Sequence, residues 1–324
     1  MSKYAEEPDL AGNRGFQDLR EGIYRWLFFG FAAATVLTTI GIFLTLFVDA
    51  IQFFREYSPV AFFTGLEWSP SLDPVSFGVL PLVSGTLVVT FTAALIAIPV
   101  GTLTAIYLSE YAERRTRAVL KPLLEILAGV PTVVYGFFAL VYVTPVIGWL
   151  FPGVSTFNVL SASLMVGVMT IPMVSSISED AMSAVPDSLR EAGYGMGATK
   201  YEVTTDIVVP AATSGIVSSY ILAISRAIGE TMIVTVAMGM QASIPSVRTA
   251  EVLGLGIPFV HPGEVFLGSG QTMTAAMVQI ANSDLSGGTP AYRSLFAIGL
   301  TLFVITLAMN VVSNAISERY REEY

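Results

Sequence analysis

Long stretches of this chain carry no charged side chain, and that feature limits the fold more than any other. No charge occurs between Trp26 and Val48 or between Val79 and Leu108. A helix needs roughly 20 apolar residues to cross about 30 Å of hydrocarbon, so each stretch is long enough to span a membrane. Four further apolar segments predict spans over about 123–151, 159–177, 215–240 and 294–316. The sequence therefore predicts an all-α membrane protein with six transmembrane helices.

The composition excludes several other classes of protein. Hydrophobic residues make up 53% of the chain and charged residues 13%, whereas about 25% of residues are charged in a typical soluble domain. A net charge of −9 argues against a nucleic-acid partner. The absence of cysteine excludes disulfides and thiolate metal sites, and the single histidine, His261, leaves no histidine-based metal cluster. We therefore expect no cofactor in this chain.

The distribution of basic residues predicts how the spans are oriented. Of the 16 Lys and Arg residues, twelve fall in the two termini and in segments 109–122 and 178–213, and three, Arg55, Arg248 and Arg293, fall in the other connecting segments. Basic residues are enriched in cytoplasmic loops. We therefore expect a cytoplasmic segment over 1–25, a transmembrane domain over 26–316, a cytoplasmic tail over 317–324, and both termini inside a multi-pass plasma-membrane protein.

Two charges inside the fifth predicted span are the strongest candidates for a substrate site. Arg226 and Glu230 are four residues apart, so they share one face of a continuous helix, with Ser219 on the same face and Thr231 beside it. Charges within a membrane usually meet a partner or a water-filled cavity. One interpretation is that the two charges only neutralise each other. The other is that the Arg226 guanidinium, with its planar donors, binds a phosphate-like oxyanion in the pathway.

The segment between the fourth and fifth spans predicts two short helices. Ser188 and Glu191 have the spacing of a capping box, which would open the first helix. Gly197 suits a turn with a positive φ. A second helix is expected over about 198–207, ending before Pro210. Taken alone, this pattern also fits a plain connector between spans.

The same segment resembles the signature of ABC-importer permeases. Glu191 and Ala192, then Gly197, then Ile207 and Pro210 have the spacing of that signature, although Gly193 replaces its second alanine and Val209 its leucine. The resemblance implies the type I, MetI-like permease fold. It also implies that segment 178–213 is a coupling loop, with Ser188, Glu191, Ala192, Gly197 and Pro210 in the part that docks on an ATPase subunit.

Three other stretches resemble the permeases of Pst phosphate importers. They are 129–136, 226–231 and, before the second span, 62–70, and the last is similar to the PstC-like branch rather than the PstA-like one. The segment 242–269 is longer than in those relatives. The resemblance implies import of inorganic phosphate with a PstA-like second permease, an ATPase dimer and an extracytoplasmic phosphate-binding protein.

A separate ATPase also agrees with the lysines of this chain. None of the three follows a glycine, so no P-loop motif exists, and ATP hydrolysis would belong to a partner chain. Lys121 and Glu125 are spaced as a helical ion pair that would anchor the third span at the membrane surface.

Two alternatives remain on sequence grounds. The permease could carry another oxyanion, such as sulfate, molybdate or phosphonate, because one arginine does not distinguish tetrahedral anions. The chain could instead be a membrane enzyme or sensor that recognises phosphate groups. The sequence offers that reading no metal cluster, no pair of nucleophile and base, and no catalytic domain outside the membrane.

Overall fold

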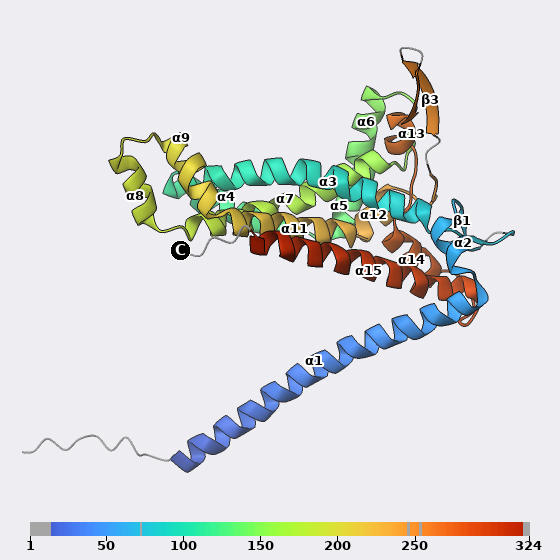
Figure 1. Ribbon diagram of the computed structural model, residues 1–324, viewed down its shortest axis with the longest axis horizontal. Coiled ribbons are helices and arrows are strands. Elements are labelled where there is room, and N and C mark those ends of the chain that lie inside the picture. The colour runs from blue at the N-terminus through green and yellow to red at the C-terminus, as the bar shows by residue number, and fades with distance from the viewer. Residues whose placement is uncertain (1–13, 72, 245–246, 253–254, 320–324) are drawn as a thin grey trace, which may run out of the picture. The chain divides into compact units, whose positions relative to one another are not determined.

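A computed structural model describes residues 14–71, 73–244, 247–252 and 255–319 (Figure 1). Its contacts divide the chain into a first unit that ends at Asp49 and a second unit from Ala50 onward. The first unit contains most of α1 (Arg14–Glu56), a helix of 43 residues. Large apolar side chains such as Phe28 and Leu37 are more than 60% exposed along α1. A helix with apolar side chains on its open surface is suited to a lipid environment.

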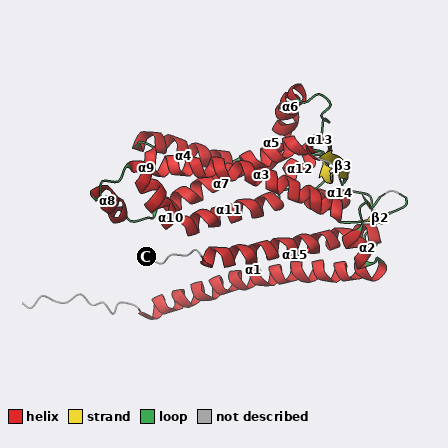
Figure 2. Cartoon of the chain, turned by 45° about the horizontal axis from the view of Figure 1, so that its top comes forward, coloured by secondary structure: helices red, strands yellow, loops and turns green. Residues whose placement is uncertain are grey.

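The second unit is almost entirely helical, and its strands are confined to the end opposite α8 (Figure 2). Its elements after α1 are α2 (Pro59–Thr64), β1 (Trp68–Ser69), β2 (Ser76–Phe77), α3 (Leu80–Ile106), η1 (Tyr107–Tyr111), α4 (Arg114–Gly129), α5 (Thr132–Phe138), η2 (Ala139–Val143), α6 (Thr144–Leu150), α7 (Val159–Ser183), α8 (Asp187–Gly195), α9 (Lys200–Glu202), η3 (Val203–Val208), α10 (Val209–Ala211), α11 (Thr213–Ile228), α12 (Met232–Ala237), β3 (Val247–Val252), β4 (Leu255–Val260), α13 (Pro262–Phe266), α14 (Met273–Ala281) and α15 (Pro290–Arg319). The η elements are π-helical turns.

The core of the second unit is the packing of α7 against α3 and α11, which lie side by side in Figure 1. Small side chains, including Ala93 and Ala97 of α3, face Val166 and Val174 of α7 in the buried clusters. Membrane helices approach closely where side chains are small, because apolar burial alone does not drive them together in lipid. This packing makes α7 the central helix.

The structure confirms the predicted all-α membrane fold. Among the residues that the structure describes, five helices are long and apolar enough to cross a membrane, namely Leu19–Glu56, Leu80–Tyr111, Thr132–Leu150, Val159–Ser183 and Pro290–Val312. A sixth span results if Lys200–Ala211 and Thr213–Ile228, which are bent by 69° at Ala212, are counted together. The predicted six spans therefore fit the structure by length and composition.

Two of the predicted spans are not continuous helices, which corrects the sequence analysis. The third is interrupted between α4 and α5, where Val130 and Pro131 have extended backbone angles. Proline disfavours helical angles in the residue before it. The fifth is interrupted between Ile228, which ends α11, and Met232, which begins α12. Pro172, in contrast, lies inside the uninterrupted α7, so a break comparable to that at Pro131 does not occur there.

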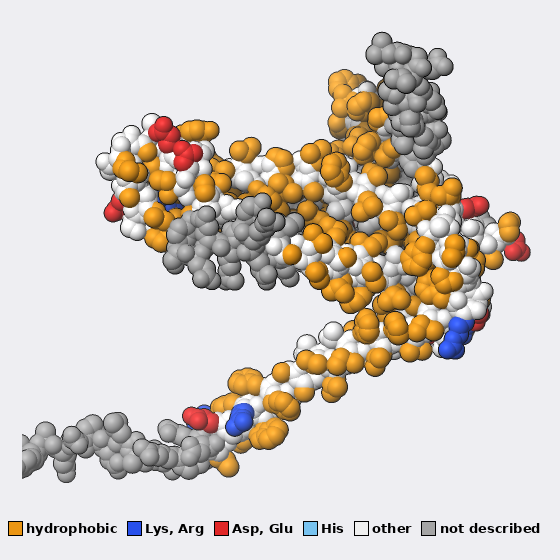
Figure 3. Space-filling view, in the orientation of Figure 1, with side chains coloured by type: hydrophobic (Ala, Val, Ile, Leu, Met, Phe, Trp, Pro, Cys, Tyr) orange, Lys and Arg blue, Asp and Glu red, His pale blue; other side chains and the backbone are white. Residues whose placement is uncertain are grey.

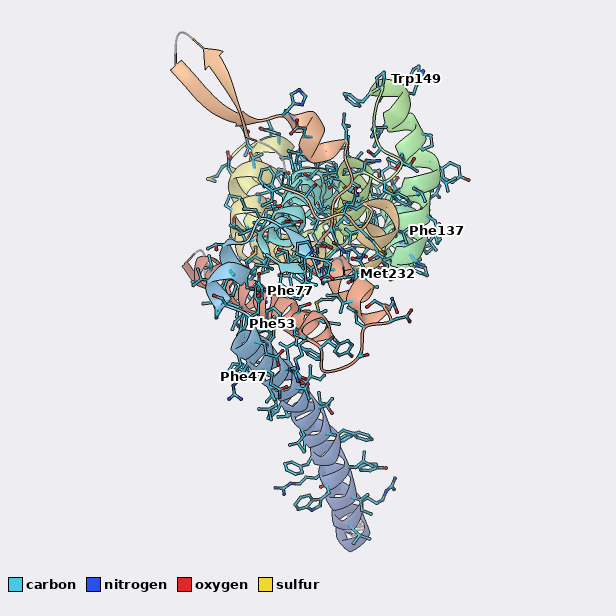
Figure 4. All side chains as sticks on the ribbon, turned by 90° about the vertical axis from the view of Figure 1, so that its right-hand side faces the viewer. Phe47, Phe53, Phe77, Phe137, Trp149 and Met232 are labelled. Atoms are coloured by element: carbon cyan, nitrogen blue, oxygen red, sulfur yellow. The ribbon has the colours of Figure 1, made fainter. Side chains whose placement is uncertain are left out.

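The end of the unit that holds the strands is ordered by aromatic side chains. Phe53 packs edge-on against Phe62 and Phe77, with ring centroids 5.6 and 5.4 Å apart, and Figure 4 labels Phe53 and Phe77 close together. Trp68 pairs with Phe77 across β1 and β2. Strands β3 and β4 form an antiparallel hairpin within 242–269, the segment expected to be longer than in related permeases.

Candidate functional site

The two helix interruptions lie next to each other. The half-helices that follow them, α5 and α12, pack side by side, and Tyr135 and Ile233 belong to one buried cluster. Figure 4 shows Phe137 of α5 and Met232 of α12 on neighbouring ribbons. Broken helices are tolerated in membranes where neighbouring protein or a cavity satisfies their backbone. This meeting point is therefore the candidate pathway site.

Glu230 holds the interruption between α11 and α12. Its carboxylate Oε1 accepts the backbone N–H groups of Met232 at 3.0 Å and Ile233 at 3.1 Å, which would otherwise lack partners at the start of α12. Its backbone oxygen accepts the hydroxyl of Thr274 at 2.7 Å. The residue is 7% exposed. A carboxylate at the start of a helix is favoured by the helix dipole, so Glu230 has a structural role as a cap.

Arg226 does not pair with Glu230, and the predicted pairing along one helix face is wrong. Because α11 ends at Ile228, Glu230 lies beyond the helix and turns toward α12. The guanidinium Nη2 lies 4.0 Å from the sulfur of Met169 in α7, and across the described part of the chain Arg226 forms no ion pair. Arg226 is exposed in the last turn of α11, next to the interruption. Its planar donors are consequently available to an anion.

The other two predicted pathway residues differ from each other in position. Ser219 is fully buried between α11 and α7, where its hydroxyl shares a hydrogen bond of 2.8 Å with that of Ser178. It therefore joins two helices and does not form an open polar face with Arg226. Thr231 is partly exposed within the interruption, and its hydroxyl donates to the backbone oxygen of Gly229 at 3.1 Å. Thr231 thus lies beside the candidate pathway site.

The segment that resembles a coupling loop is a pair of helices, but its capping box is not where the sequence placed it. α8 begins at Asp187 after Pro186, without a side-chain cap, so Ser188 and Glu191 both lie inside the helix. The capping box belongs to Thr199 and Glu202, which open the second helix through bonds of 2.7 and 3.3 Å. Ser188 and Thr199 have the same spacing to a glutamate, so the predicted capping box of Ser188 and Glu191 is wrong.

Two glycines shape the turn between these helices. Gly197 has a φ of +87°, as predicted. A Cβ on Gly193 would lie 2.6 Å from Cδ1 of Ile207, so this departure from the permease signature permits close packing of α8 on η3. The second helix does not end before Pro210, because the π-helical η3 leads directly into α10 and the chain bends after Ala211. Pro210 at the start of α10 has no N–H to leave unpaired.

The outward side of this helix pair is exposed. Met196 is 83% exposed, Tyr201 68% and Tyr194 45%, and Glu191 and Ala192 are also exposed. Figure 3 shows acidic side chains gathered at this end of the second unit. Exposed aromatic and methionine side chains gathered on one surface are typical of a contact surface for another protein.

A buried charge cluster near the same end was missed by the sequence analysis. Glu179, in the last turns of α7, is 0% exposed and forms ion pairs with Arg117 and with Lys121 of α4, the latter at 2.6 Å. Lys121 also binds Asp180 at 2.8 Å, and these hydrogen bonds raise the pKa of its ammonium group. Lys121 is therefore not paired with Glu125, which is exposed. The sequence did contain a signal for this cluster. A group of basic residues in 114–121 and two acidic residues, Glu179 and Asp180, directly after the fourth predicted span, both fall in segments predicted on the same side of the membrane.

No group of three or more His, Cys, Asp or Glu side chains that could hold a metal ion occurs within the described ranges. The arrangement offers hydrogen-bond donors and charges at a helix interruption, and a rigid exposed helix pair at one end. Those features suit the passage of a solute and contact with another protein.

Comparison with known proteins agrees with this assignment. Residues 97–322 match the family described as "Binding-protein-dependent transport system inner membrane component". The chain is 32% identical to the "Phosphate transport system permease protein PstC" of Xylella fastidiosa (strain 9a5c), over 95% of this chain and 94% of that protein. It is 31% identical to the "Probable ABC transporter permease protein YqgH" of Bacillus subtilis (strain 168), over 89% and 88% of the two chains.

Solved structures share the fold. A chain of a bacterial ABC transporter involved in the import of the acidic polysaccharide alginate aligns with a TM-score of 0.63 and 14% identity, over 94% of this chain and all of that chain. A chain of the MetNI methionine ABC transporter in an inward-facing conformation aligns with a TM-score of 0.53 and 16% identity, over 76% and 95%. At these identities the likeness concerns the fold alone. The match over residues 97–322, together with the fold, shows that the chain belongs to the inner-membrane permeases of binding-protein-dependent ABC importers.

Proposed function

We propose that this permease carries inorganic phosphate into the cell and that Arg226 contacts the passing anion. The observation that carries the proposal is the separation of Arg226 from Glu230. Because Glu230 is committed to capping α12, the guanidinium at the interruption is not neutralised by it. A guanidinium donates parallel hydrogen bonds that match the oxygen atoms of phosphate.

The exposure of Arg226 also suits a site that binds its solute only moderately, as transport requires. A solute must bind its pathway strongly enough to enter and weakly enough to leave. An exposed guanidinium remains partly hydrated, so its attraction for an anion is moderate compared with that of a buried one. The position beside two half-helices, α5 and α12, supports this role because the interruption leaves polar backbone groups near the same place.

The choice of phosphate rests on the relatives. Proteins named PstC, from Xylella fastidiosa and several other bacteria, align over most of the chain at about 30% identity. The relative from Bacillus subtilis is named only as a probable ABC transporter permease. Another oxyanion, such as sulfate, molybdate or phosphonate, is therefore the competing substrate class.

The proposed assembly follows the same reasoning. The end that carries α8 would face the cytoplasm, with both termini, and an ATPase dimer would dock on the exposed side of α8 and α9. A PstA-like second permease would complete the pathway, and an extracytoplasmic phosphate-binding protein would deliver the solute. The positive-inside distribution and the exposed Met196 and Tyr201 support this arrangement.

Uptake by the complete reconstituted importer tests the substrate. Proteoliposomes that contain the complex and internal ATP are supplied with the binding protein and either radiolabelled phosphate or radiolabelled sulfate. We expect ATP-dependent accumulation of phosphate that excess unlabelled phosphate suppresses and sulfate does not. Accumulation of sulfate instead of phosphate would assign the permease to another oxyanion.

A further inference from the structure

Arg190 of α8 connects three separate segments of the second unit. Its Nη2 lies 3.0 Å from a carboxylate oxygen of Glu110 in η1, the turn that ends the α3 span. The same nitrogen donates to the backbone oxygen of Met182 at 2.8 Å, and Nη1 donates to that of Val185 at 2.6 Å. One guanidinium therefore holds α8 to the ends of both the α3 and α7 spans.

The side chain is turned inward, in contrast to its neighbour in the chain. The Arg190 side chain is 15% exposed and that of Glu110 is 5% exposed, whereas Glu191 is exposed. A further contact with Asp187, three residues earlier in α8, spans 3.2 Å, but the Asp187 side chain is 89% exposed. An ion pair with an exposed partner contributes little to the stability of the fold. The contacts that matter are therefore those directed at the membrane helices.

These contacts depend on the shape of arginine. The planar guanidinium directs several N–H donors at once, which lets it serve a carboxylate and two carbonyl oxygens, whereas a lysine ammonium is a single point charge. One carbonyl oxygen belongs to Met182 in the last turn of α7 and the other to Val185 just beyond that helix, where the helix dipole favours a positive charge. Removal of Arg190 would leave the buried carboxylate of Glu110 without its cation and the end of α7 without these donors.

We infer that Arg190 is a positioning residue that makes α8 move as one body with the ends of the α3 and α7 spans, so that movement of the docked ATPase reaches the membrane helices. The inference rests on the proposed function, in which α8 is the docking element. It assigns the transmission of that movement to the Arg190 and Glu110 contact, while the outward side of α8 serves binding.

A thiol reporter tests the inference without depending on which solute is carried. The chain has no cysteine, and Gly229 is exposed in the interruption beside Arg226, with no atom closer than 3.7 Å to an added Cβ. The complete importer carrying Gly229→Cys is labelled with a thiol reagent in the nucleotide-free state and after trapping with ATP and vanadate. The ratio of the two labelling rates reports whether the membrane helices respond to the ATPase.

The complex with Arg190→Gln and Gly229→Cys should assemble, bind ATP and hydrolyse it. The ratio of its two labelling rates should move toward one by roughly 5-fold or more, the usual range for loss of coupling between two sites. Arg190→Lys should retain part of the response. Arg115→Gln is the matched control, because Arg115 is exposed and makes no ion pair with the described residues, and it should respond like the parent.

An unchanged ratio in Arg190→Gln, with the ATPase bound, would overturn the inference. If Arg190→Gln does not assemble, Glu110→Gln is measured in the same way, because it weakens the contact while the carbonyl contacts of Arg190 remain. An unchanged ratio there would also overturn the inference. A parent complex that responds to nucleotide but carries no phosphate would contradict the proposed substrate and leave the role of Arg190 standing, whereas a chain that binds no ATPase would contradict both.

Discussion

The carboxylate of Glu230 accepts the backbone N–H of Ile233 at 3.1 Å, which fixes the start of α12 and leaves Arg226 to other partners. The two charged residues are only four positions apart in the sequence, yet Glu230 caps a helix and Arg226 does not take part in that cap. This separation determines what the variants of each residue should do.

Removal of the Glu230 cap should destabilise the protein without involving Arg226. Glu230→Ala should lower the free energy of unfolding by about 0.5–2 kcal/mol, the usual range for loss of a helix cap. Because no ion pair joins the two residues, the double variant Arg226→Gln with Glu230→Ala should lose only the sum of the two single losses, within about 0.5 kcal/mol. Thermal unfolding in detergent measures the loss of stability in each single variant and in the double variant. A clearly smaller loss in the double variant would restore the interpretation that the charges neutralise each other.

The turn between α8 and α9 should tolerate few side chains at Gly197. Valine at a φ of +87° is strained, and the left-handed conformation costs a non-glycine residue about 1–2 kcal/mol. Gly197→Val should therefore reduce recovery of the ATPase with the purified permease while membrane insertion stays normal. Gly197→Asn is the matched control, because asparagine adopts positive φ more readily. Equal recovery in the two variants would contradict a shape-dependent docking element.

Substitution of Glu179 should reduce the stability of the protein more than substitution of an exposed acidic residue. The Glu179 side chain is 1% exposed, while those of Arg117 and Lys121 are 38% and 30% exposed. Its loss should therefore cost less than the about 3–5 kcal/mol that follows when a fully buried ion pair is broken. We expect Glu179→Gln to lower the melting temperature and the yield of the permease markedly. Asp180→Asn, whose side chain is 66% exposed and binds the same lysine, should change little. Similar losses in both variants would show that burial is not the decisive factor.

The proposed orientation predicts a labelling pattern in intact cells. Ser188 is exposed in α8, and Ser71 is exposed near β1 at the other end of the unit. A cysteine at Ser188 should react with membrane-permeant thiol reagents alone, and a cysteine at Ser71 with impermeant reagents as well. Blocking with a permeant reagent before cell lysis is the control for access. The reverse pattern would require the opposite orientation.

The length of the apolar segments was sufficient to predict the spans, because crossing a membrane is mainly a matter of length and hydropathy. It did not predict where a span is interrupted. The break at Gly229 to Thr231 depends on Glu230 supplying a cap from its side chain, which spacing alone does not reveal. For the same reason the helical spacing of Arg226 and Glu230 was misleading.

The capping box and the buried cluster show the same limit. Ser188 with Glu191 and Thr199 with Glu202 have identical spacing, and only the entry of the chain into α8 at Asp187 distinguishes them. The fourth span was expected over about 159–177. α7 continues to Ser183 because Arg117 and Lys121, distant in sequence, neutralise Glu179.

The most direct test of the role of Arg226 is the initial rate of ATP-dependent phosphate uptake by the reconstituted importer. The rate is divided by the amount of assembled complex and compared between the parent and Arg226→Gln. Arg226 is exposed and makes no ion pair within the described residues, so the variant should assemble like the parent. Arg114→Gln, an exposed arginine far from the interruption in sequence, is the control. We expect phosphate uptake by the parent and the control and a loss of about tenfold or more in Arg226→Gln, as for removal of a charged hydrogen-bond donor worth about 1.5–3 kcal/mol. Uptake by Arg226→Gln at the parental rate would contradict the claim that Arg226 contacts phosphate on its way through the membrane.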